Sequence, residues 1–300
     1  MKRASRVSLA AIRSLIPAGL VLALSFSLFP ADGTRRPGRR QDPLAFARDP
    51  VLAPLLARAA EYCDRLESSV LNFVCREKIE EWTRSSVRRM GLAFVGPREK
   101  HRYLYDYQLA RDREGLCEER RTLLKDDGKE VSVSGAPLKT RSFSHGKVIE
   151  GPLGLLRREV QAVHDYTIIG QEKALGEEAV VIEVVPKPGE AAGGLYGKAW
   201  LRKSDAGILR IEWTPGSIGN YQTIEEQARR LEMTPACVFI SEYAFEKNGV
   251  RFPSRFTAKE IYRRKSGISA QLAQVDVVYD EYKFFTVETK VDIRSGGQRP

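Results

Sequence analysis

The chain has 300 residues, of which 42% are hydrophobic and 29% are charged, a composition typical of globular proteins rather than disordered or fibrous ones. The formal net charge is +10, but the leader at residues 1–33 and the cluster Arg35, Arg36, Arg39 and Arg40 hold much of it and leave 41 basic against 38 acidic residues. This nearly neutral body argues against a nucleic-acid groove as the main function, and we expect no nucleic-acid partner.

Residues 1–33 have the features of an export signal: a basic start, an apolar run from Leu15 to Phe29, and a small-x-small pattern at Ala31 to Gly33. The run is shorter than the roughly 20 apolar residues that a membrane-spanning helix needs. We therefore predict a signal peptide cleaved near Gly33 and an exported protein, periplasmic or associated with the outer envelope. An uncleaved anchor is the alternative, because the four following arginines weaken the charge asymmetry that orients such segments.

Export makes the cysteines candidates for disulfide bonds, since exported proteins meet an oxidising compartment. The four candidates are Cys63, Cys75, Cys117 and Cys237. Their spacing contains no C-x-x-C pattern, which argues against thiol-redox and zinc-ribbon sites and leaves the pairing open. Free cysteines buried as small hydrophobic side chains are the alternative.

The first regular element expected in chain order is an amphipathic helix that follows a basic, flexible tether at residues 34–48. Asp49 supplies an N-cap acceptor and Pro50 suits the first helical position. Apolar residues then repeat at spacings of three and four from Leu52 to Val70, which predicts a helix of about 20 residues packed against the core.

From Phe73 the apolar residues alternate with period two, which indicates strands. The stretch at 128–162 is poorly patterned apart from Gly151 to Leu156, which predicts a short helix or lid, and Ile224 to Glu232 predicts a surface helix within 217–235. The strands expected are 73–83, 101–112, 116–125, 164–173, 178–186, 196–204, 208–214, 237–247, 250–264, 270–283 and 285–293.

Tight connections join several of these strands, including Leu175-Gly176-Glu177, Asp205-Ala206-Gly207 and Lys247-Asn248-Gly249, the last with the Asn-Gly pair of type I′ hairpins. We therefore predict a mainly β fold with α (α+β): a strongly curved antiparallel sheet, or incomplete β-barrel, of about ten strands. Residues 49–293 form this single half-barrel domain, with the N-terminal helix across its concave face and a flexible tail at 294–300.

One face of the predicted sheet is apolar, and we interpret it as the lining of a ligand cavity, with an ordinary filled core as the alternative. If the site is partly empty, Trp213→Ala should weaken ligand binding. It should also lower the free energy of unfolding by less than the roughly 3–5 kcal/mol typical of aromatic truncation in a filled core. The candidate lining residues are Val180, Ile182, Val184, Leu209, Ile211, Trp213, Phe239 and Phe245.

The sequence lacks the motifs that would indicate catalysis, and this argues against an enzyme. His101, His145 and His164 share no metal-binding spacing, and Ser217 stands in Pro215-Gly-Ser-Ile-Gly219, which lacks the first glycine of a nucleophile elbow. Adjacent carboxylates such as Glu80 and Glu81 face opposite ways on a strand, and we interpret them as solvated. We expect no catalytic residues, no cofactor and no metal site.

The order of the segments resembles a known group of envelope proteins. The passages Ala60 to Leu66 and Phe73 to Glu77, followed by Leu195 to Lys203 and Ile208 to Trp213, are similar to uncharacterised exported bacterial proteins with the layout of the periplasmic and outer-membrane lipoprotein carriers (LolA/LolB-like). The resemblance is one of layout over residues 50–293. It implies a half-barrel with a helical lid that holds acyl chains, and it assigns no ligand-contacting residue.

These observations predict an exported, non-enzymatic binder or carrier of an apolar ligand, such as a lipid or an acyl chain, in the bacterial envelope. The expected partner is an apolar ligand or a lipidated protein. The alternative is a protein-protein interaction or sensor module on the same scaffold, with an envelope protein as its partner.

Overall fold

The computed structural model describes residues 50–69, 73–84, 88–90, 93–111, 117–143, 150–189, 196–218 and 221–285. All of them belong to one compact unit, Asp42–Pro300. The predicted signal peptide, the tether, the C-terminal tail and residues 286–293 of the last predicted strand lie outside the described residues. No helix in the described part is long and apolar enough to span a bilayer.

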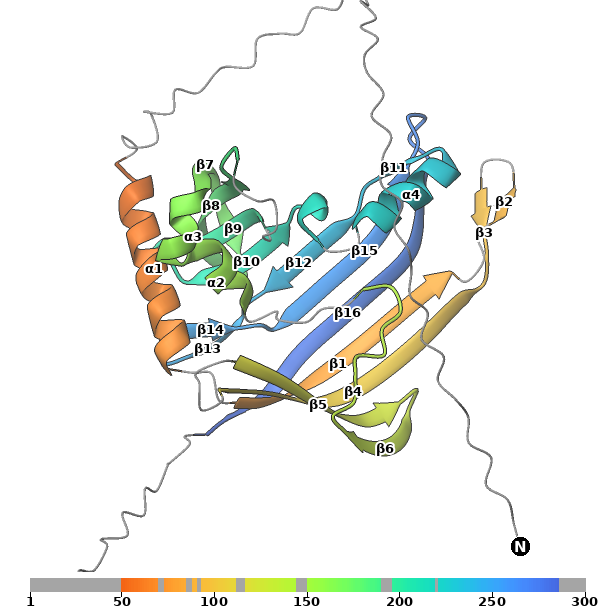
Figure 1. Ribbon diagram of the computed structural model, residues 1–300, viewed down its shortest axis with the longest axis horizontal. Helices are drawn as coiled ribbons and strands as arrows, with labels where there is room; N and C mark the ends of the chain where they lie inside the picture. Colours follow the sequence, from red (N-terminus) through yellow and green to blue (C-terminus); the bar gives the residue numbers. More distant parts are fainter. Residues whose placement is uncertain are drawn as a thin grey trace, which may run out of the picture. The chain divides into compact units, whose positions relative to one another are not determined.

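The predicted N-terminal helix is present as α1 (Leu52–Ser69), which begins two residues after Pro50. Its apolar stripe is buried, including Leu55, Tyr62 and Leu66. The helix contacts α2 (Glu150–Leu156), α3 (Arg158–Val163), β7 (His164–Ala174) and β14 (Val250–Phe252). It therefore covers one end of the sheet, together with α2 and α3 (Figure 1). We expected it to lie across the concave face, and the structure places it at this end instead.

A single curved, unclosed sheet of twelve strands forms the body of the protein, and neighbouring strands pair antiparallel. Its order is β6-β5-β4-β1-β16-β15-β12-β10-β9-β8-β7, with β11 added beside β15. The strands not yet given are β1 (Phe73–Arg84), β4 (Arg98–Arg111), β5 (Cys117–Asp126), β6 (Lys129–Ser134), β8 (Glu177–Pro186), β9 (Gly197–Arg202), β10 (Ile208–Trp213), β11 (Thr234–Pro235), β12 (Val238–Glu242), β15 (Arg255–Arg263) and β16 (Ser269–Phe284).

Tight turns link consecutive strands, as the sequence predicts. In Asn248-Gly249 both residues have positive φ (54° and 71°), and Leu175-Gly176 and Asp127-Gly128 share this feature. Two successive positive φ values define the type I′ turn, whose twist matches that of the flanking strands. Two small hairpins, β2 (Arg88–Met90) with β3 (Ala93–Val95) and β13 (Phe245–Lys247) with β14, stand outside the main sheet.

Two predicted strands are broken in the structure. The segment 237–247 divides into β12 and β13, and 250–264 divides into β14 and β15 at Pro253. Proline has no N–H to donate to a sheet ladder, and the Ser254 hydroxyl instead donates to the Glu242 carbonyl and accepts from the Ala244 amide. The broken segments leave the sheet as a side hairpin near α1. Strand β6 lies within the stretch that we expected to lack regular structure.

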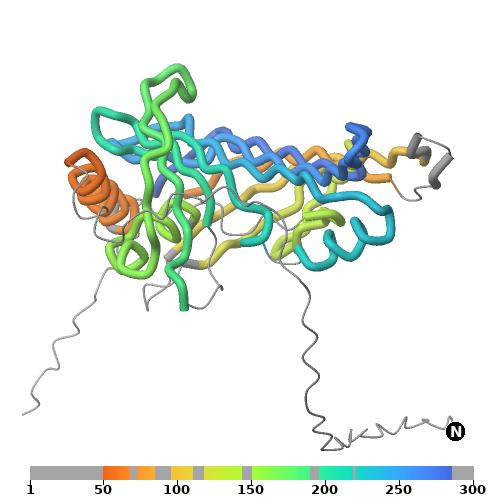
Figure 2. The backbone as a smooth tube through the Cα atoms, turned by 90° about the horizontal axis from the view of Figure 1, so that it is seen from above, coloured from red at the N-terminus to blue at the C-terminus, as the bar shows by residue number. Residues whose placement is uncertain are grey.

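The main core lies between α1, α2 and one side of the sheet, which we call the inner face. A small cluster on the other side, the outer face, includes Val181 and Trp200. A third cluster lies under α4 (Tyr221–Leu231), at the end of the sheet away from α1 (Figure 2). The α1 and α4 ends thus flank the middle of the inner face.

Candidate functional site: the covered inner face of the sheet

Most of the predicted apolar residues come together on the inner face. Side chains from β8, β10 and β12 contribute to the main core, and their exposed fraction is at most 5%. These strands lie close together in the sheet, in the order β12-β10-β9-β8, although up to 59 positions separate the residues in sequence. The candidate residues that lie on the inner face are Val180, Ile182, Val184, Ile211, Trp213 and Phe239.

Two of the predicted lining residues do not face this site. Leu209 packs on the outer face with Val181 and Trp200. An irregularity in the β9–β10 pairing between Ile208 and Arg210 shifts the alternation, so the period-two pattern from Leu209 to Trp213 was misleading. Phe245 is 37% exposed in the side hairpin, where it stacks on Tyr282 with ring centroids 4.8 Å apart.

A helical segment covers the apolar half of the inner face. In α2 a Cβ built on Gly151 would lie 2.9 Å from the Trp213 ring and 2.9 Å from the Tyr243 hydroxyl oxygen, so the helix backbone rests directly on these side chains. Trp213 Nε1 donates to the Ser241 hydroxyl at 3.0 Å. The lid predicted at Gly151 to Leu156 is therefore a short helix seated on β10 and on Tyr243.

The other half of the inner face is covered by residues 135–143, which we call the strap. The Tyr105 hydroxyl donates to the Pro137 carbonyl and accepts from the Lys139 amide, both at 3.2 Å. The Glu81 carboxylate accepts from the amides of Arg141 and Ser142 at 2.9 Å. The strap has neither helix nor strand structure, and these side-chain anchors hold it against β1 and β4.

The strap ends at Phe143, whose ring packs edge-on against Phe239 with centroids 5.3 Å apart. Strap, α2 and α3 together form a cover over the inner face. In this conformation the protein fills the site, because Ile182, Val184 and Ile211 have no exposed surface. Trp213 is 5% exposed, and with this packing we expect Trp213→Ala to lower the free energy of unfolding by the full value of roughly 3–5 kcal/mol typical of a filled core.

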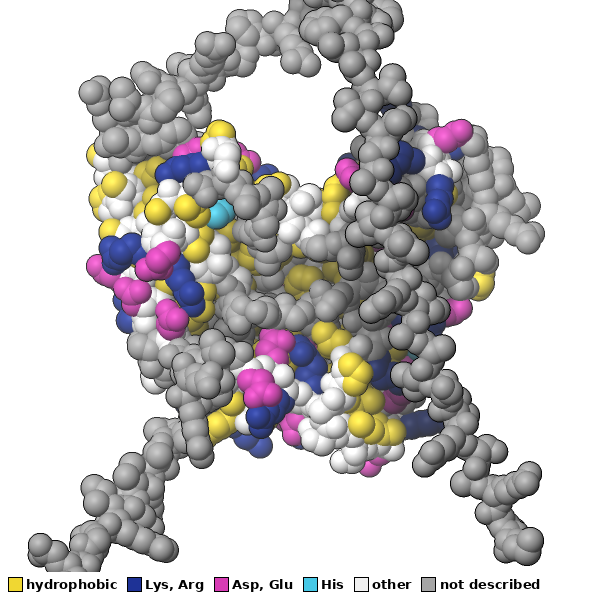
Figure 3. All heavy atoms as spheres, viewed as in Figure 1, with side chains coloured by type: hydrophobic (Ala, Val, Ile, Leu, Met, Phe, Trp, Pro, Cys, Tyr) yellow, Lys and Arg dark blue, Asp and Glu magenta, His cyan; other side chains and the backbone are white. Residues whose placement is uncertain are grey.

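Between the two ends of the sheet the protein surface is hollowed, and hydrophobic side chains lie at the floor of the hollow (Figure 3). Partly buried hydrophobic side chains pack around the core from the strap, from α4 and from the segment before it. They include Leu138, Phe143, Ile218 and Ile224. Among the described residues, these side chains continue the apolar surface from the core around Trp213 toward the middle of the sheet.

A buried polar cluster lies on the inner face beside this apolar region. Arg121 from β5 donates through Nε to Glu77 Oε2 at 2.8 Å and through Nη2 to Glu77 Oε1 at 3.2 Å. Tyr279 donates to Glu77, and Tyr107 donates to Glu119, which also accepts from Arg121. Burial raises the pKa of Tyr107 and Tyr279 well above the ordinary value, so both hydroxyls stay protonated as donors.

Sequence reasoning missed two residues of this face, Glu77 and Glu81, which are both completely buried. Interpreting Glu81 as solvated was wrong, although it does face away from Glu80, which pairs with Lys100 and Arg102. A signal was present: both glutamates stand in phase with the apolar residues Phe73, Cys75 and Ile79. A carboxylate on the apolar phase of a strand needs a buried partner.

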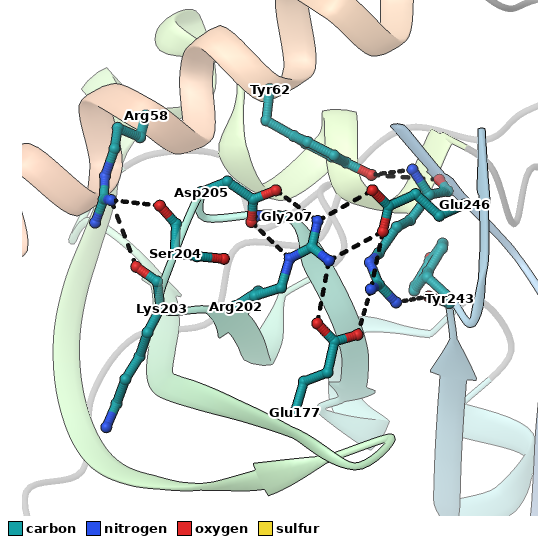
Figure 4. A network of polar contacts seen from close by, with 11 residues as sticks. Arg58, Tyr62, Glu177, Arg202, Lys203, Ser204, Asp205, Gly207, Tyr243 and Glu246 are labelled. Atoms are coloured by element: carbon teal, nitrogen blue, oxygen red, sulfur yellow. Dashed lines mark hydrogen bonds and ion pairs between the residues drawn. The ribbon is translucent and has the colours of Figure 1, made fainter. Parts of the chain in front are cut away.

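A second ion cluster ties α1 to the sheet (Figure 4). Arg202 pairs with Asp205, Glu177 and Glu246, and Arg251 pairs with the same two glutamates and donates to the Tyr243 carbonyl. The Tyr62 hydroxyl of α1 accepts a hydrogen bond from the Arg251 amide at 3.1 Å and donates one to the Arg251 carbonyl at 3.3 Å. From α1, Arg58 also donates to the carbonyls of Lys203 and Ser204.

Hydrogen bonds and charges from the neighbouring arginines determine the pKa values of the carboxylates in this cluster. Burial acts to raise the pKa of Glu177, but the hydrogen bond from Arg202 and the charge of Arg251 outweigh it and lower the pKa. Asp205 follows the same balance, with Arg202 and the Gly207 amide as its donors. Both carboxylates are therefore ionised at neutral pH, and we assign the cluster a structural role.

The described cysteines are free thiols rather than disulfide partners. Cys63 on α1 and Cys75 on β1 are buried in the main core, and Cys237 is partly buried. Cys63 Sγ lies 3.6 Å from the Pro152 carbonyl oxygen of α2, where the apolar stripe of α1 requires a small side chain. The side chain of Cys117 lies outside the described residues.

Within the described ranges, no group of three or more His, Cys, Asp or Glu side chains is placed to hold a metal ion. His101 contacts Asp127 and His164 contacts the Val160 carbonyl, so the two are far from forming one site, and His145 is not described. Ser217 Oγ donates to the carbonyls of Tyr196 and Thr214. The inner face therefore offers apolar contact and buried hydrogen bonds.

No protein-family model matches the chain, and neither does any curated protein. Solved structures with a similar layout include a DUF1329 family protein from Desulfovibrio piger (10% identity, 80% of this chain and 95% of that one, TM-score 0.36). A LolA superfamily protein from Nitrosomonas europaea is similar at 12% identity, over 78% of this chain and 94% of that one, with a TM-score of 0.33. MucB of Pseudomonas aeruginosa in complex with MucA is similar at 11% identity, over 76% of this chain and 99% of that one, with a TM-score of 0.21.

Proposed function

We propose that this protein is an exported, non-enzymatic binder or carrier of an apolar ligand, such as a lipid or an acyl chain, in the bacterial envelope. The observation that supports this most is the way the inner face is covered. A broad apolar and aromatic surface is closed by a strap without helix or strand structure and by a seven-residue helix. An acyl chain offers the kind of apolar contact that α2 makes with Trp213 and that Phe143 makes with Phe239, so it can replace these contacts without loss of buried apolar area.

The mode of attachment of the strap supports the same proposal. Its anchors are separate long-range contacts: hydrogen bonds to Tyr105, Glu81 and the Arg121 carbonyl, and ion pairs of Lys139 with Asp126 and of Arg141 with Glu99. A segment without a hydrogen-bonded ladder of its own opens at a lower free energy than the strands beneath it, which is a property of segments that move for ligands. The leader sequence supports export, and the ligand would then be met in the envelope.

The first experiment asks whether the protein carries lipid. Protein isolated from the exported fraction of a bacterial host is extracted with organic solvent, and the extract is analysed by mass spectrometry. We expect a stoichiometric lipid, and we expect the empty protein to bind an environment-sensitive fluorescent fatty-acid analogue. Retention of the chain in the cytoplasm would contradict export, and absence of both lipid and probe binding would contradict the carrier function.

Two neighbouring glutamates provide a matched test of the cover. In Glu81→Ala the amides of Arg141 and Ser142 lose their acceptor, so we expect the strap to loosen and the probe to associate faster by roughly tenfold, because an unsatisfied buried group costs about 1–3 kcal/mol. Glu80→Ala removes the same group from the opposite side of β1 and should leave the association rate unchanged. Equal rates in both variants would place the ligand elsewhere.

A second candidate function is interaction with an envelope protein. All six residues of the edge strand β6 are exposed, and Val131 and Val133 are 37% and 49% exposed. Such an edge can accept a strand from a partner protein. A lipid-free protein that does not bind the probe, but that loses a partner when Val133 is changed to Lys, would favour this function over the carrier.

A further inference from the structure

We propose that the groove between α4 and the β15–β16 turn binds a phosphate group. Both α4 and this turn lie at the end of the sheet away from α1 (Figure 1). The proposal does not depend on the proposed apolar ligand. The volume of the groove is about 410 Å³, and its lining residues are Glu232, Met233, Thr234, Arg263, Arg264, Lys265 and Ser266.

The walls of the groove are held by backbone contacts. On one side the Arg264 amide donates to the Ile268 carbonyl at 2.8 Å and the Gly267 amide donates to the Arg264 carbonyl at 3.0 Å, which closes the turn. On the other side Thr234 of β11 pairs with Arg263 of β15, and the Met233 amide donates to the Ala228 carbonyl of α4. These contacts fix the backbone positions of the three consecutive cations, Arg263 at the end of β15 and Arg264 and Lys265 in the turn.

These cations have no partners within the described residues. No ion pair or side-chain hydrogen bond of that part of the chain involves Arg263, Arg264 or Lys265. Three positive charges against the single negative charge of Glu232 give the lining a net charge of +2. Arg229 and Arg230 in the last turn of α4 already offset the negative end of that helix, so the turn cations are not needed for this purpose.

Arg264 points most directly to an anion. Its Nε and Nη2 are both buried and lack a hydrogen-bond acceptor among the described residues. Arg157, Arg210 and Arg251 each have a buried Nε without an acceptor, but every one of them forms an ion pair through its terminal nitrogens. A buried charged donor without an acceptor is costly, and in a groove lined by cations an anion is the group that supplies the acceptors.

The chemistry of the lining favours phosphate among anions. A guanidinium presents parallel N–H donors that match two oxygens of a phosphate, and a neighbouring lysine adds a point charge. The hydroxyls of Thr234 and Ser266 supply further donors, and the net charge of +2 matches a phosphate dianion. A free phosphate or phosphorylated small molecule and the headgroup of an anionic phospholipid share this chemistry.

The experiment uses the full mature chain and two sources of phosphate. Inorganic phosphate is titrated by calorimetry at constant ionic strength, and vesicles of phosphatidylcholine with and without phosphatidic acid are tested by co-sedimentation. Arg264→Gln should weaken binding at least roughly tenfold, because a charge-assisted hydrogen-bond pair is lost. Arg264→Lys keeps the charge and should lose part of the affinity.

Lys129→Gln is the matched control, because it removes one positive charge from an exposed residue of β6 that has no ion pair among the described residues. Saturable phosphate binding that Arg264→Gln abolishes and Lys129→Gln leaves intact supports the site with a soluble ligand. Vesicle binding alone, with the same pattern in the two variants, supports the site with a lipid headgroup. Absence of both, or equal loss in the two variants while thermal unfolding stays unchanged, overturns the proposal.

Discussion

At the scale of single residues, charged side chains buried beside the sheet determine much of what holds the elements together. Arg251 is 6% exposed as a side chain, and it joins the β7–β8 turn, through Glu177, to the side hairpin, through Glu246. The surface pair of Lys78 and Asp280 has the same chemistry, but water surrounds both partners. Burial therefore decides how much each ion pair contributes to the free energy of unfolding.

We expect Arg251→Met to lower the free energy of unfolding by about 3 kcal/mol, because it leaves Glu177 and Glu246 short of a cation in a partly buried place. Lys78→Met should change it by less than about 1 kcal/mol, since exposed pairs are screened by water. Urea unfolding followed by circular dichroism measures both variants. Similar changes in the two would show that the cluster in Figure 4 is no more than a surface network.

At the scale of elements, the helix α2 shows how a local preference and a tertiary contact oppose each other. Alanine suits a helix better than glycine by up to about 1 kcal/mol, so both glycines of α2 look like sites for stabilisation. Gly151 lies against Trp213 and Tyr243, however, whereas no heavy atom lies within 4 Å of a Cβ built on Gly154. Their surroundings in the fold, rather than their helix, give them different roles.

Gly151→Ala should lower the free energy of unfolding by roughly 1–2 kcal/mol, because the added methyl group forces two packed aromatic side chains to shift. Gly154→Ala on the same helix should raise it by up to about 1 kcal/mol. Thermal or urea unfolding of the pair decides the matter. A stabilised Gly151→Ala variant would mean that α2 does not rest on β10 as the structure describes.

At the scale of the whole molecule, the attachment of α1 to one end of the sheet makes its cysteine a reporter of opening. Cys63 has no exposed surface, and burial raises the pKa of its thiol to about 12. Burial also raises the pKa of Cys75 on β1. Thiolate is the reactive form, so neither residue should react with a thiol reagent at pH 8 while the protein is folded.

In a Cys117→Ser background, we expect Cys63 and Cys75 to react with the thiol reagent only as fast as the protein unfolds globally. In denaturant without reductant, we expect to count three thiols, those of Cys63, Cys75 and Cys237. Labelling of Cys63 well below the unfolding transition, while Cys75 stays protected, would show that α1 separates from the sheet on its own. A count of one thiol would instead reveal the disulfide that export allows.

Local patterns in the sequence determined the elements themselves. The stripe from Leu52 predicted α1, period-two alternation predicted most strands, and Asn248-Gly249 predicted a type I′ turn. These features depend on neighbours within a few residues, through helix periodicity, strand alternation and backbone conformation, and the antiparallel curved sheet followed from joining them. The apolar phase of β8 and most of that of β10 could likewise be assigned to one face.

Tertiary structure alone decided which residues line the inner face and which segments cover it. Glu81 and Arg121 look like surface charges in sequence, but their partners, the strap and Glu77, come from segments tens of residues away. The irregular pairing beside Leu209 turned it to the outer face, and the break after Glu242 at the end of β12 left Phe245 in the side hairpin. The strap has no period of its own, and long-range contacts with Tyr105, Glu81 and Phe239 hold it in place. Long-range pairing of this kind leaves no periodic signal in a sequence, and it is what closes the candidate site of this protein.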